Sequence, residues 1–157
     1  MNIVIDIATQ TLTLHQDAHV LRRYSVSTAL KGAGQLKNSE QTPLGRHIIR
    51  AKIGAGKPLN TVFKARRPTG EIYASELAEK YPHRDWILTR ILWLSGCEVG
   101  KNRLGNCDTM QRYIYIHGAP ESEPMGVPAS HGCIRMRNSD LIELFILTPV
   151  YTPVLIQ

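Results

Sequence analysis

The chain has 157 residues, of which 43% are hydrophobic and 20% are charged, and its formal net charge is +6 at pH 7. A chain of this length buries about 68–70% of the surface that its unfolded form exposes, so we expect a single domain, residues 1–157, and no second one. No run approaches the ~18 consecutive apolar residues that a transmembrane helix needs, which excludes a membrane span, and the positive charge favours an anionic partner.

The N-terminal third shows the period of two that is typical of strands. Apolar and polar residues alternate through residues 2–7, 12–14 and 19–28, with short turns between these runs. We therefore expect a hairpin that continues into a meander. Residues 31–43 are rich in glycine and polar side chains and predict an exposed loop, which is followed by a strand at 46–53.

The middle of the chain is harder to assign. Residues 54–69 hold two glycines and two prolines and are expected to be mostly irregular, and Ser75–Tyr81 predicts a short helix that Pro82 ends. The apolar run Trp86–Ser95 fits a buried strand or a short helix, and we favour the strand. A glycine-containing loop then leads to Arg112–His117, where aromatic and β-branched residues alternate as in a strand.

The C-terminal segment predicts one more helix and one more strand. Asn138 or Ser139 can cap a helix that runs through Leu147 and ends before Pro149. Tyr151–Ile156 predicts a closing strand, so the pattern as a whole indicates a mainly β domain.

The stretch from His117 to Arg135 carries the candidate chemistry. It places Cys133 between a glycine and a β-branched residue, downstream of His117 and His131. A free thiol has a pKa of about 8.5 and is mostly uncharged at neutral pH, so a nearby imidazole that accepts its proton makes it a nucleophile. We expect Cys133 to attack a carbonyl carbon and His117 to act as base and then as acid, with the Gly118 carbonyl orienting the imidazole.

The residues around Cys133 have candidate roles, and two of them, Arg135 and His131, have two alternative interpretations. Gly132 lets the backbone approach a substrate, and the amides near it are candidates for stabilising an oxyanion. Arg135 either binds a substrate carboxylate or makes a structural salt bridge. His131 is either a second acid or base or a hydrogen-bonded scaffold residue.

The motifs IHGAP and SHGCIRMRNSD, at residues 116–120 and 130–140, resemble the signature of the L,D-transpeptidase (YkuD-domain) family. The opening NIVIDIATQTLTLHQD, VST at 26–28 and TPLG at 42–45 are similar to other recurrent pieces of that domain, so the resemblance covers almost the whole chain. Alanine stands at position 119, where the family commonly has threonine.

The resemblance implies the catalytic fold of that family, which is β-rich, with mixed sheets arranged like a β-sandwich and one or two short helices. It also implies a cysteine nucleophile that attacks the bond between the third residue of a peptidoglycan stem peptide and the terminal D-alanine, with no cofactor and no metal. The implied catalytic residues are Cys133, His117, Gly118 and His131. The implied substrate-binding residues are Ser130, Gly132 and Arg135.

The acceptor of the acyl group distinguishes two activities within this family. The segment Trp93–Asp108 is similar to a loop in short relatives that act as L,D-carboxypeptidases in cell-wall recycling, where water is the acceptor. The first residues lack the pattern of a secretory signal, which predicts a cytoplasmic protein, or a periplasmic one if a signal peptide has been removed. A cytoplasmic enzyme would meet soluble stem peptides or muropeptides, so we expect the carboxypeptidase, with the cross-linking transpeptidase as the alternative.

Two other classes of protein, a zinc protein and a nucleic-acid-binding protein, are alternatives to an enzyme of this kind. A zinc protein would use Cys97, Cys107, His117, His131 and Cys133, but their spacings match no compact ligand pattern. The sequence pI near 9.4 is compatible with nucleic-acid binding, but the basic residues form neither a stripe nor a known motif. We therefore expect no nucleic-acid partner and no obligate protein partner. Cys97 and Cys107 are expected to be ordinary thiols, with a redox switch as the alternative.

Overall fold

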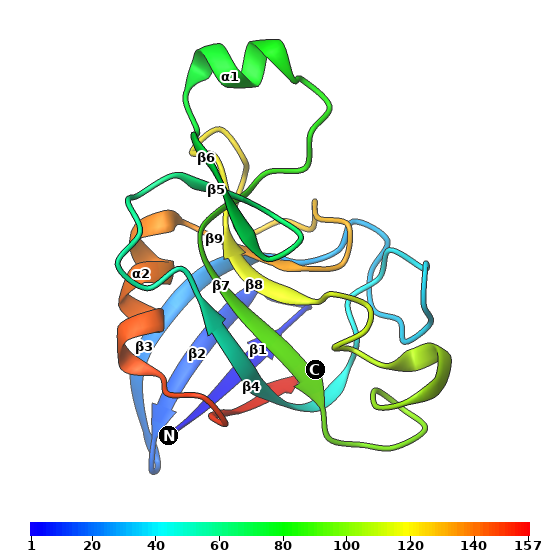
Figure 1. The fold of residues 1–157 in the computed structure, drawn as a ribbon. Coiled ribbons are helices and arrows are strands. Elements are labelled where there is room, and N and C mark those ends of the chain that lie inside the picture. The colour runs from blue at the N-terminus through cyan, green and yellow to red at the C-terminus, as the bar shows by residue number, and fades with distance from the viewer.

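The computed structural model describes residues 1–157, whose strands form one continuous ten-stranded sheet (Figure 1). The strands are β1 (Asn2–Asp6), β2 (Thr11–Gln16), β3 (His19–Ser27), β4 (Gly45–Ile53), β5 (Thr61–Lys64), β6 (Arg67–Ile72), β7 (Ile87–Gly96), β8 (Tyr115–Gly118), β9 (Ile134–Met136) and β10 (Pro153–Ile156). The helices are α1 (Ser75–Lys80), α2 (Asn138–Leu147) and the short 3₁₀ turn η1 (Gly105–Cys107).

The sheet closes on itself because β4 pairs with two strands, β10 on one side and β7 on the other. The resulting ring runs β4-β10-β1-β2-β3-β9-β8-β7, and β5 and β6 continue from β7 outside it. Most neighbours are antiparallel, whereas β1–β10 and β8–β9 are parallel. The predicted mainly β fold with a mixed sheet and two short helices is confirmed, and ring closure gives it a barrel-like form.

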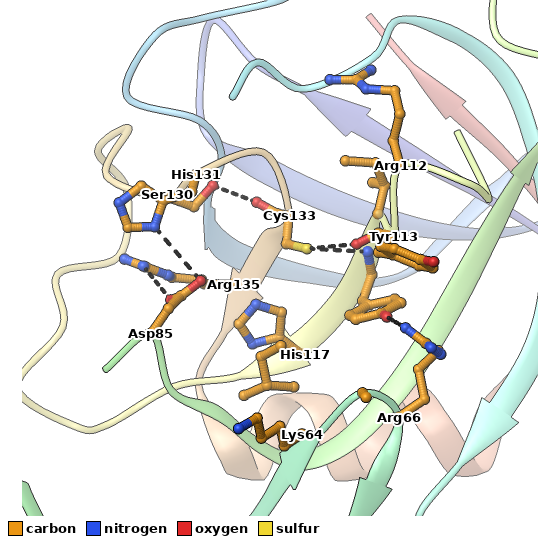
Figure 2. A pocket seen from close by; sticks show the side chains of 14 residues that line it. Lys64, Arg66, Asp85, Arg112, Tyr113, His117, Ser130, His131, Cys133 and Arg135 are labelled. Carbon is orange, nitrogen blue, oxygen red and sulfur yellow. Dashed lines mark hydrogen bonds and ion pairs between the residues drawn. The ribbon is translucent and has the colours of Figure 1, made fainter. Parts of the chain in front are cut away.

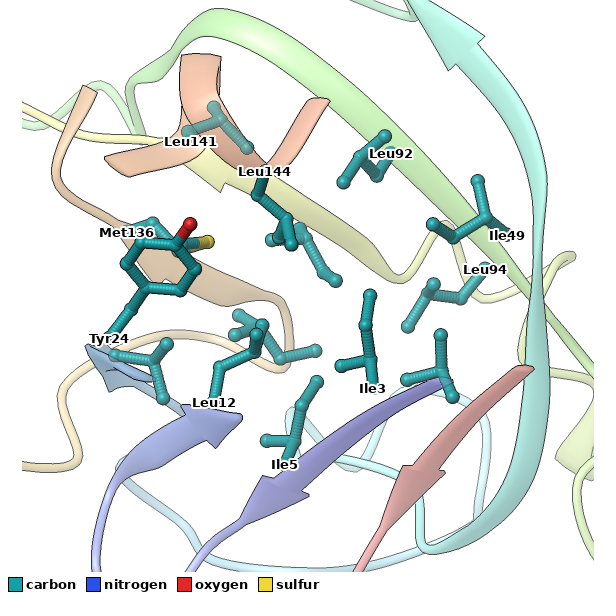
Figure 3. Packing of buried hydrophobic residues seen from close by; sticks show 14 of the residues in the cluster. Ile3, Ile5, Leu12, Tyr24, Ile49, Leu92, Leu94, Met136, Leu141 and Leu144 are labelled. Atoms are coloured by element: carbon teal, nitrogen blue, oxygen red, sulfur yellow. The ribbon is translucent and has the colours of Figure 1, made fainter. Parts of the chain in front are cut away.

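The inside of the ring is the main hydrophobic core, a cluster of 18 buried residues (Figure 3). The period of two in β1 and β2 turns Ile3, Ile5, Leu12 and Leu14 inward, and all four are fully buried. Helix α2 packs against β7 and β8 and adds Leu141 to the same cluster. The core therefore lies directly behind β8, a strand of the candidate site.

The β5–β6 hairpin corrects the prediction that residues 54–69 are mostly irregular. Lys64 pairs with Arg67 across a two-residue turn in which Ala65 and Arg66 have φ angles of 48° and 64°. Turns with two positive φ values suit the twist of a hairpin and usually contain asparagine or glycine. Alanine and arginine stand at these two positions, so the sequence lacks the asparagine or glycine that would have indicated a hairpin. Figure 1 shows this hairpin and α1 projecting from one end of the ring.

The other elements lie close to their predicted positions, with differences at their ends. The strand expected at 112–117 begins only at Tyr115, because the chain is still turning at Tyr113, whose φ is 57°. The ambiguous run before residue 96 is the strand β7, and both predicted helices form. At 6 and 10 residues, neither helix is long enough to cross a membrane.

Candidate active site

Two parallel neighbours, β8 and β9, bring the distant parts of the signature together. In their register His117 lies opposite Arg135, and Ile116 lies opposite Ile134. Side chains alternate between the two faces of a strand, so the isoleucines enter the core while His117 and Arg135 face the other way. Cys133 directly precedes β9 and lies two residues before Arg135. Its side chain is therefore on the same face of the sheet as that of Arg135.

These side chains line a cavity of about 580 Å³ (Figure 2). Three segments form its wall, namely the tip of the β5–β6 hairpin, the end of the loop before β7, and the chain around β8 and β9. Its lining includes the polar or charged side chains of Lys64, Arg66, Asp85, Arg112, His117, Ser130, His131, Cys133 and Arg135. Figure 2 shows the thiol of Cys133 and the imidazole of His117 both turned into this cavity.

The thiol of Cys133 is held by the backbone of the segment that leads into β8. Its Sγ accepts a hydrogen bond from the Tyr115 amide at 3.3 Å and donates one to the Tyr113 carbonyl oxygen at 3.3 Å. Burial raises the pKa of Cys133 to about 12 and outweighs the lowering effect of the Tyr115 amide and two arginines. The resting group is therefore an uncharged thiol, and it makes no hydrogen bond to His117.

The imidazole of His117 is buried and oriented by its own backbone. Its Nδ1 lies 2.7 Å from the Gly118 carbonyl oxygen, so Nδ1 carries the proton and donates it, which leaves Nε2 free to accept one. Burial lowers the pKa of His117, although Asp85 and the Gly118 carbonyl oppose this effect. A neutral imidazole with an unprotonated Nε2 is the form that a general base needs.

Gly118 is the predicted orienting residue, and the structure shows why it is a glycine. A Cβ at this position would collide with Asn138 and with the Leu88 carbonyl. Asn138, at the start of α2, also donates through Nδ2 to the Ala119 carbonyl at 3.1 Å. The first residue of the helix therefore fixes the backbone that directs His117.

Ser130 and Gly132 form a tight turn before Cys133. The Ser130 hydroxyl donates to the Cys133 carbonyl at 2.5 Å and accepts from the Gly132 amide at 3.2 Å. Gly132 has a φ of 131°, which side chains rarely allow, and its carbonyl accepts from Thr42 Oγ1 at 2.9 Å. The turn is thus anchored by residues on both sides, and its amides remain our candidates for an oxyanion site.

Arg135 is engaged by carboxylates of the chain itself. It lies 3.0 Å from Asp85 and 3.3 Å from Glu123, and its side chain is only 8% exposed. Of the two interpretations drawn from the sequence, the structure shows the salt bridge, and the binding of a substrate carboxylate by Arg135 stays a prediction. Asp85 gave no signal in the sequence because it lies 50 residues away.

His131 lies at the rim of the cavity, with its side chain 61% exposed. Its Nδ1 is 3.6 Å from Asp85 Oδ2, and it makes no hydrogen bond to Cys133. The His131 ring therefore makes no hydrogen bond of the kind that the scaffold interpretation expects, and both interpretations of this residue stay predictions. Sequence reasoning missed Lys64 as well as Asp85 at this site.

Three residues of the zinc alternative, His117, His131 and Cys133, line the cavity, whereas Cys97 and Cys107 do not. No group of three or more histidine, cysteine or acidic side chains is arranged to hold a metal ion. All three cysteines are free, with Cys97 exposed and Cys107 buried. Cys107 donates a hydrogen bond to the Leu104 carbonyl at 3.2 Å.

Comparison with known proteins identifies the domain. The family model described as the L,D-transpeptidase catalytic domain (YkuD) matches residues 1–156. No curated protein sequence matches the chain.

Solved structures share the fold at low sequence identity. An L,D-transpeptidase from Mycobacterium smegmatis is 22% identical with a TM-score of 0.62, and the match covers 99% of this chain and 57% of that one. L,D-transpeptidase 3 from Mycobacterium tuberculosis, in complex with a faropenem-derived adduct, is 17% identical with a TM-score of 0.59 over 99% and 59%. An Enterococcus faecium L,D-transpeptidase mutant is 17% identical with a TM-score of 0.60 over 99% and 49%. The chain therefore spans about half to three fifths of the length of these proteins.

Proposed function

The chain belongs to the L,D-transpeptidase catalytic domain (YkuD) family, and we propose that it is an L,D-carboxypeptidase that removes the terminal D-alanine from peptidoglycan stem tetrapeptides. The observation that carries this proposal is the shared cavity of Cys133 and His117. A thiol and an imidazole with a free Nε2 on one wall are the groups that acyl transfer through a thioester requires.

The first half of the reaction forms the thioester. Cys133 Sγ attacks the carbonyl carbon of the third stem residue while its proton passes to His117 Nε2. His117 then gives this proton to the amide nitrogen, the carbon–nitrogen bond breaks, and D-alanine leaves. Because the resting thiol donates to the Tyr113 carbonyl, the Cys133 side chain must first turn towards His117.

The second half releases the peptide. Water attacks the thioester carbon, its proton passes to His117 Nε2, and the carbon–sulfur bond breaks as the thiolate regains a proton. The products are a tripeptide with a new carboxyl group and the free thiol, so the enzyme returns to its starting state.

The charge of the cavity favours water over an amine as acceptor. Its lining carries four cationic side chains, and the one of Arg135 is paired with the carboxylates of Asp85 and Glu123, so the positive excess is carried by Lys64, Arg66 and Arg112. The amine of an acceptor peptide is an ammonium ion at neutral pH, so it approaches against this excess of positive charge. Water meets no such barrier.

Mass spectrometry of a tetrapeptide reaction in heavy-oxygen water tests the proposal. We expect a tripeptide that carries one heavy oxygen atom, and no product with the Cys133→Ala variant as the matched control. A cross-linked dimer, or exchange with an added D-amino acid, would contradict the carboxypeptidase and support the transpeptidase through the same thioester. Absence of any turnover would contradict both.

We also propose that the substrate is a soluble recycled fragment in the cytoplasm. Immunoblotting of cytoplasmic and periplasmic fractions from the source cells tests this location. Detection in the periplasmic fraction alone would contradict it.

A further inference from the structure

The tip of the β5–β6 hairpin holds a cation over the catalytic cavity. The turn residues Ala65 and Arg66 both have positive φ angles, 48° and 64°, and both line the cavity together with Lys64. The Arg66 side chain lies against Tyr113, in the segment that leads into β8 (Figure 2). An uncommon backbone conformation at this tip thus determines where the guanidinium lies.

The Arg66 guanidinium contacts three neutral aromatic side chains. Nη1 donates to the Tyr115 hydroxyl at 3.0 Å, and the guanidinium carbon lies 4.4 Å from the centre of the Tyr113 ring and 5.1 Å from that of Trp93. These contacts orient the group but leave its charge uncompensated. Neither Arg66 nor Lys64 takes part in any ion pair of the chain.

The guanidinium groups of the other two arginines in the cavity are already bound by neighbouring groups of the chain. Arg135 pairs with two carboxylates. Arg112 donates to the Gly34 and Gln41 carbonyls and to Ser39, all in the loop beside the site. Both terminal nitrogens of Arg112 are thus already used, so the cationic groups with donors left for an anion lie on the hairpin side.

Covalent geometry indicates which anion reaches this charge. In a tetrapeptide that Cys133 attacks, the terminal carboxylate is only three bonds from the attacked carbonyl carbon, which is about 4 Å or less. Tyr115 connects the guanidinium of Arg66 to the thiol of Cys133, since its hydroxyl accepts a hydrogen bond from Arg66 while its amide donates one to Cys133 Sγ. A carboxylate so close to the thiol lies in the same cavity as the guanidinium.

We propose that Arg66, assisted by Lys64, binds the terminal carboxylate of the peptide whose acyl group is transferred to Cys133. This inference rests on the proposed function and names a specificity residue for it. The guanidinium offers paired donors that match the two carboxylate oxygens, and its stacking on Tyr113 holds it in place before the substrate arrives. The enzyme is then selective for peptides with a free C-terminus.

Kinetics with two substrates test this assignment, using the tetrapeptide acid and the same peptide with a terminal amide. Arg66→Gln keeps a donor for the Tyr115 hydroxyl but removes the charge, and we expect it to raise KM for the acid about tenfold to a hundredfold, with a smaller change in kcat. KM for the amide should change little. Arg67→Ala, in the same hairpin but outside the cavity wall, is the matched control and should leave both substrates unaffected.

Two results would overturn the assignment. One is an equal rise in KM for acid and amide, which indicates a merely structural role for Arg66. The other is a loss that disappears only when a different carboxylate of the peptide is amidated, which means that Arg66 binds that group instead.

Binding to the inactive Cys133→Ala protein separates this inference from the proposed function. Calorimetry should show tighter binding of the tetrapeptide acid than of its terminal amide, and adding Arg66→Gln should abolish the difference. The measurement needs no turnover, so it tests the carboxylate site even if the wild-type enzyme cleaves none of these peptides. Equal binding of acid and amide would refute the site.

Discussion

The thiol of Cys133 donates its hydrogen bond to the carbonyl oxygen of Tyr113, 3.3 Å away, and not to the imidazole of His117. With burial raising the pKa of Cys133 to about 12 and lowering that of His117, the resting pair is uncharged on both sides. Both shifts favour the uncharged thiol and the neutral imidazole over a thiolate–imidazolium pair. The proton moves when a substrate carbonyl is present to receive the sulfur.

Removal of either member of this pair should abolish catalysis without unfolding the domain. We expect no measurable turnover for Cys133→Ala, and a loss of about 10²–10⁴-fold for His117→Ala because its general acid–base contribution disappears. Tripeptide release, with circular dichroism as a check on folding, measures both. Replacing Cys97 and Cys107 together with serine is the control and should retain most activity. A collapse in that variant would mean that another thiol reacts.

The resting thiol should be slow to alkylate at neutral pH. Only the thiolate reacts, and a pKa of about 12 keeps its fraction small until the solution is strongly alkaline. In a protein that lacks Cys97 and Cys107, the iodoacetamide rate at Cys133 should still rise above pH 10, where that of an unstructured cysteine peptide with a pKa of about 8.5 has levelled off. Intact-mass measurements follow the reaction. A plateau below pH 8 would show that the resting group is already a thiolate.

The fall of activity at acidic pH should follow the protonation of the His117 imidazole. The base works only when neutral, and its pKa is lowered by burial, so activity should persist below pH 6.5 and fall only at more acidic values. Asp85 opposes that lowering, so Asp85→Asn should move the limb of kcat/KM to still lower pH. Glu123→Gln removes the other carboxylate on Arg135 and should leave the limb in place. An identical shift in both variants would assign the effect to Arg135 instead.

Gly132 should tolerate no side chain. Its φ of 131° strains any other residue, and a Cβ would lie 3.3 Å from the Gln41 carbonyl oxygen. Gly132→Ala should therefore destabilise the protein by about 1–3 kcal/mol and lower kcat by displacing the turn before Cys133. Gly126 also has a positive φ, 83°, but open space around it, so Gly126→Ala should cost some stability and keep kcat. Urea unfolding and kinetics distinguish the two.

His47 should make the fold sensitive to acid. Its ring is buried between the Gly45 carbonyl and the Thr109 hydroxyl, each at 2.9 Å, and burial lowers its pKa to about 4. The unfolded chain takes up the proton below pH 6.5 and the folded chain does not, so this stabilisation is present above pH 6.5. It is lost as the pH falls towards 4, at about 1.4 kcal/mol per unit and about 3 kcal/mol in all.

Urea unfolding at several pH values measures this slope. His47→Gln should reduce it, and His117 adds a contribution of the same sign that remains. An unchanged slope in His47→Gln would contradict the assignment, and the exposed His83→Gln serves as the control.

Local patterns in the sequence were enough to predict most of the secondary structure and the family. Alternation in residues 2–7 and 12–14 predicted β1 and β2, and the signature around Cys133 and His117 predicted the family. These features are encoded within a few residues, because side-chain parity and turn chemistry are local properties of a strand.

Only the tertiary structure decided which groups surround that pair. Asp85 meets Arg135 across 50 residues and Arg66 meets Tyr115 across 49, because sheet register brings β5, β7, β8 and β9 side by side. No local pattern specifies a partner so far along the chain. The resting state of the thiol was likewise beyond the sequence, since it depends on burial and on the Tyr113 carbonyl. Sequence thus supplied the reactive groups, and packing set their charge and their neighbours.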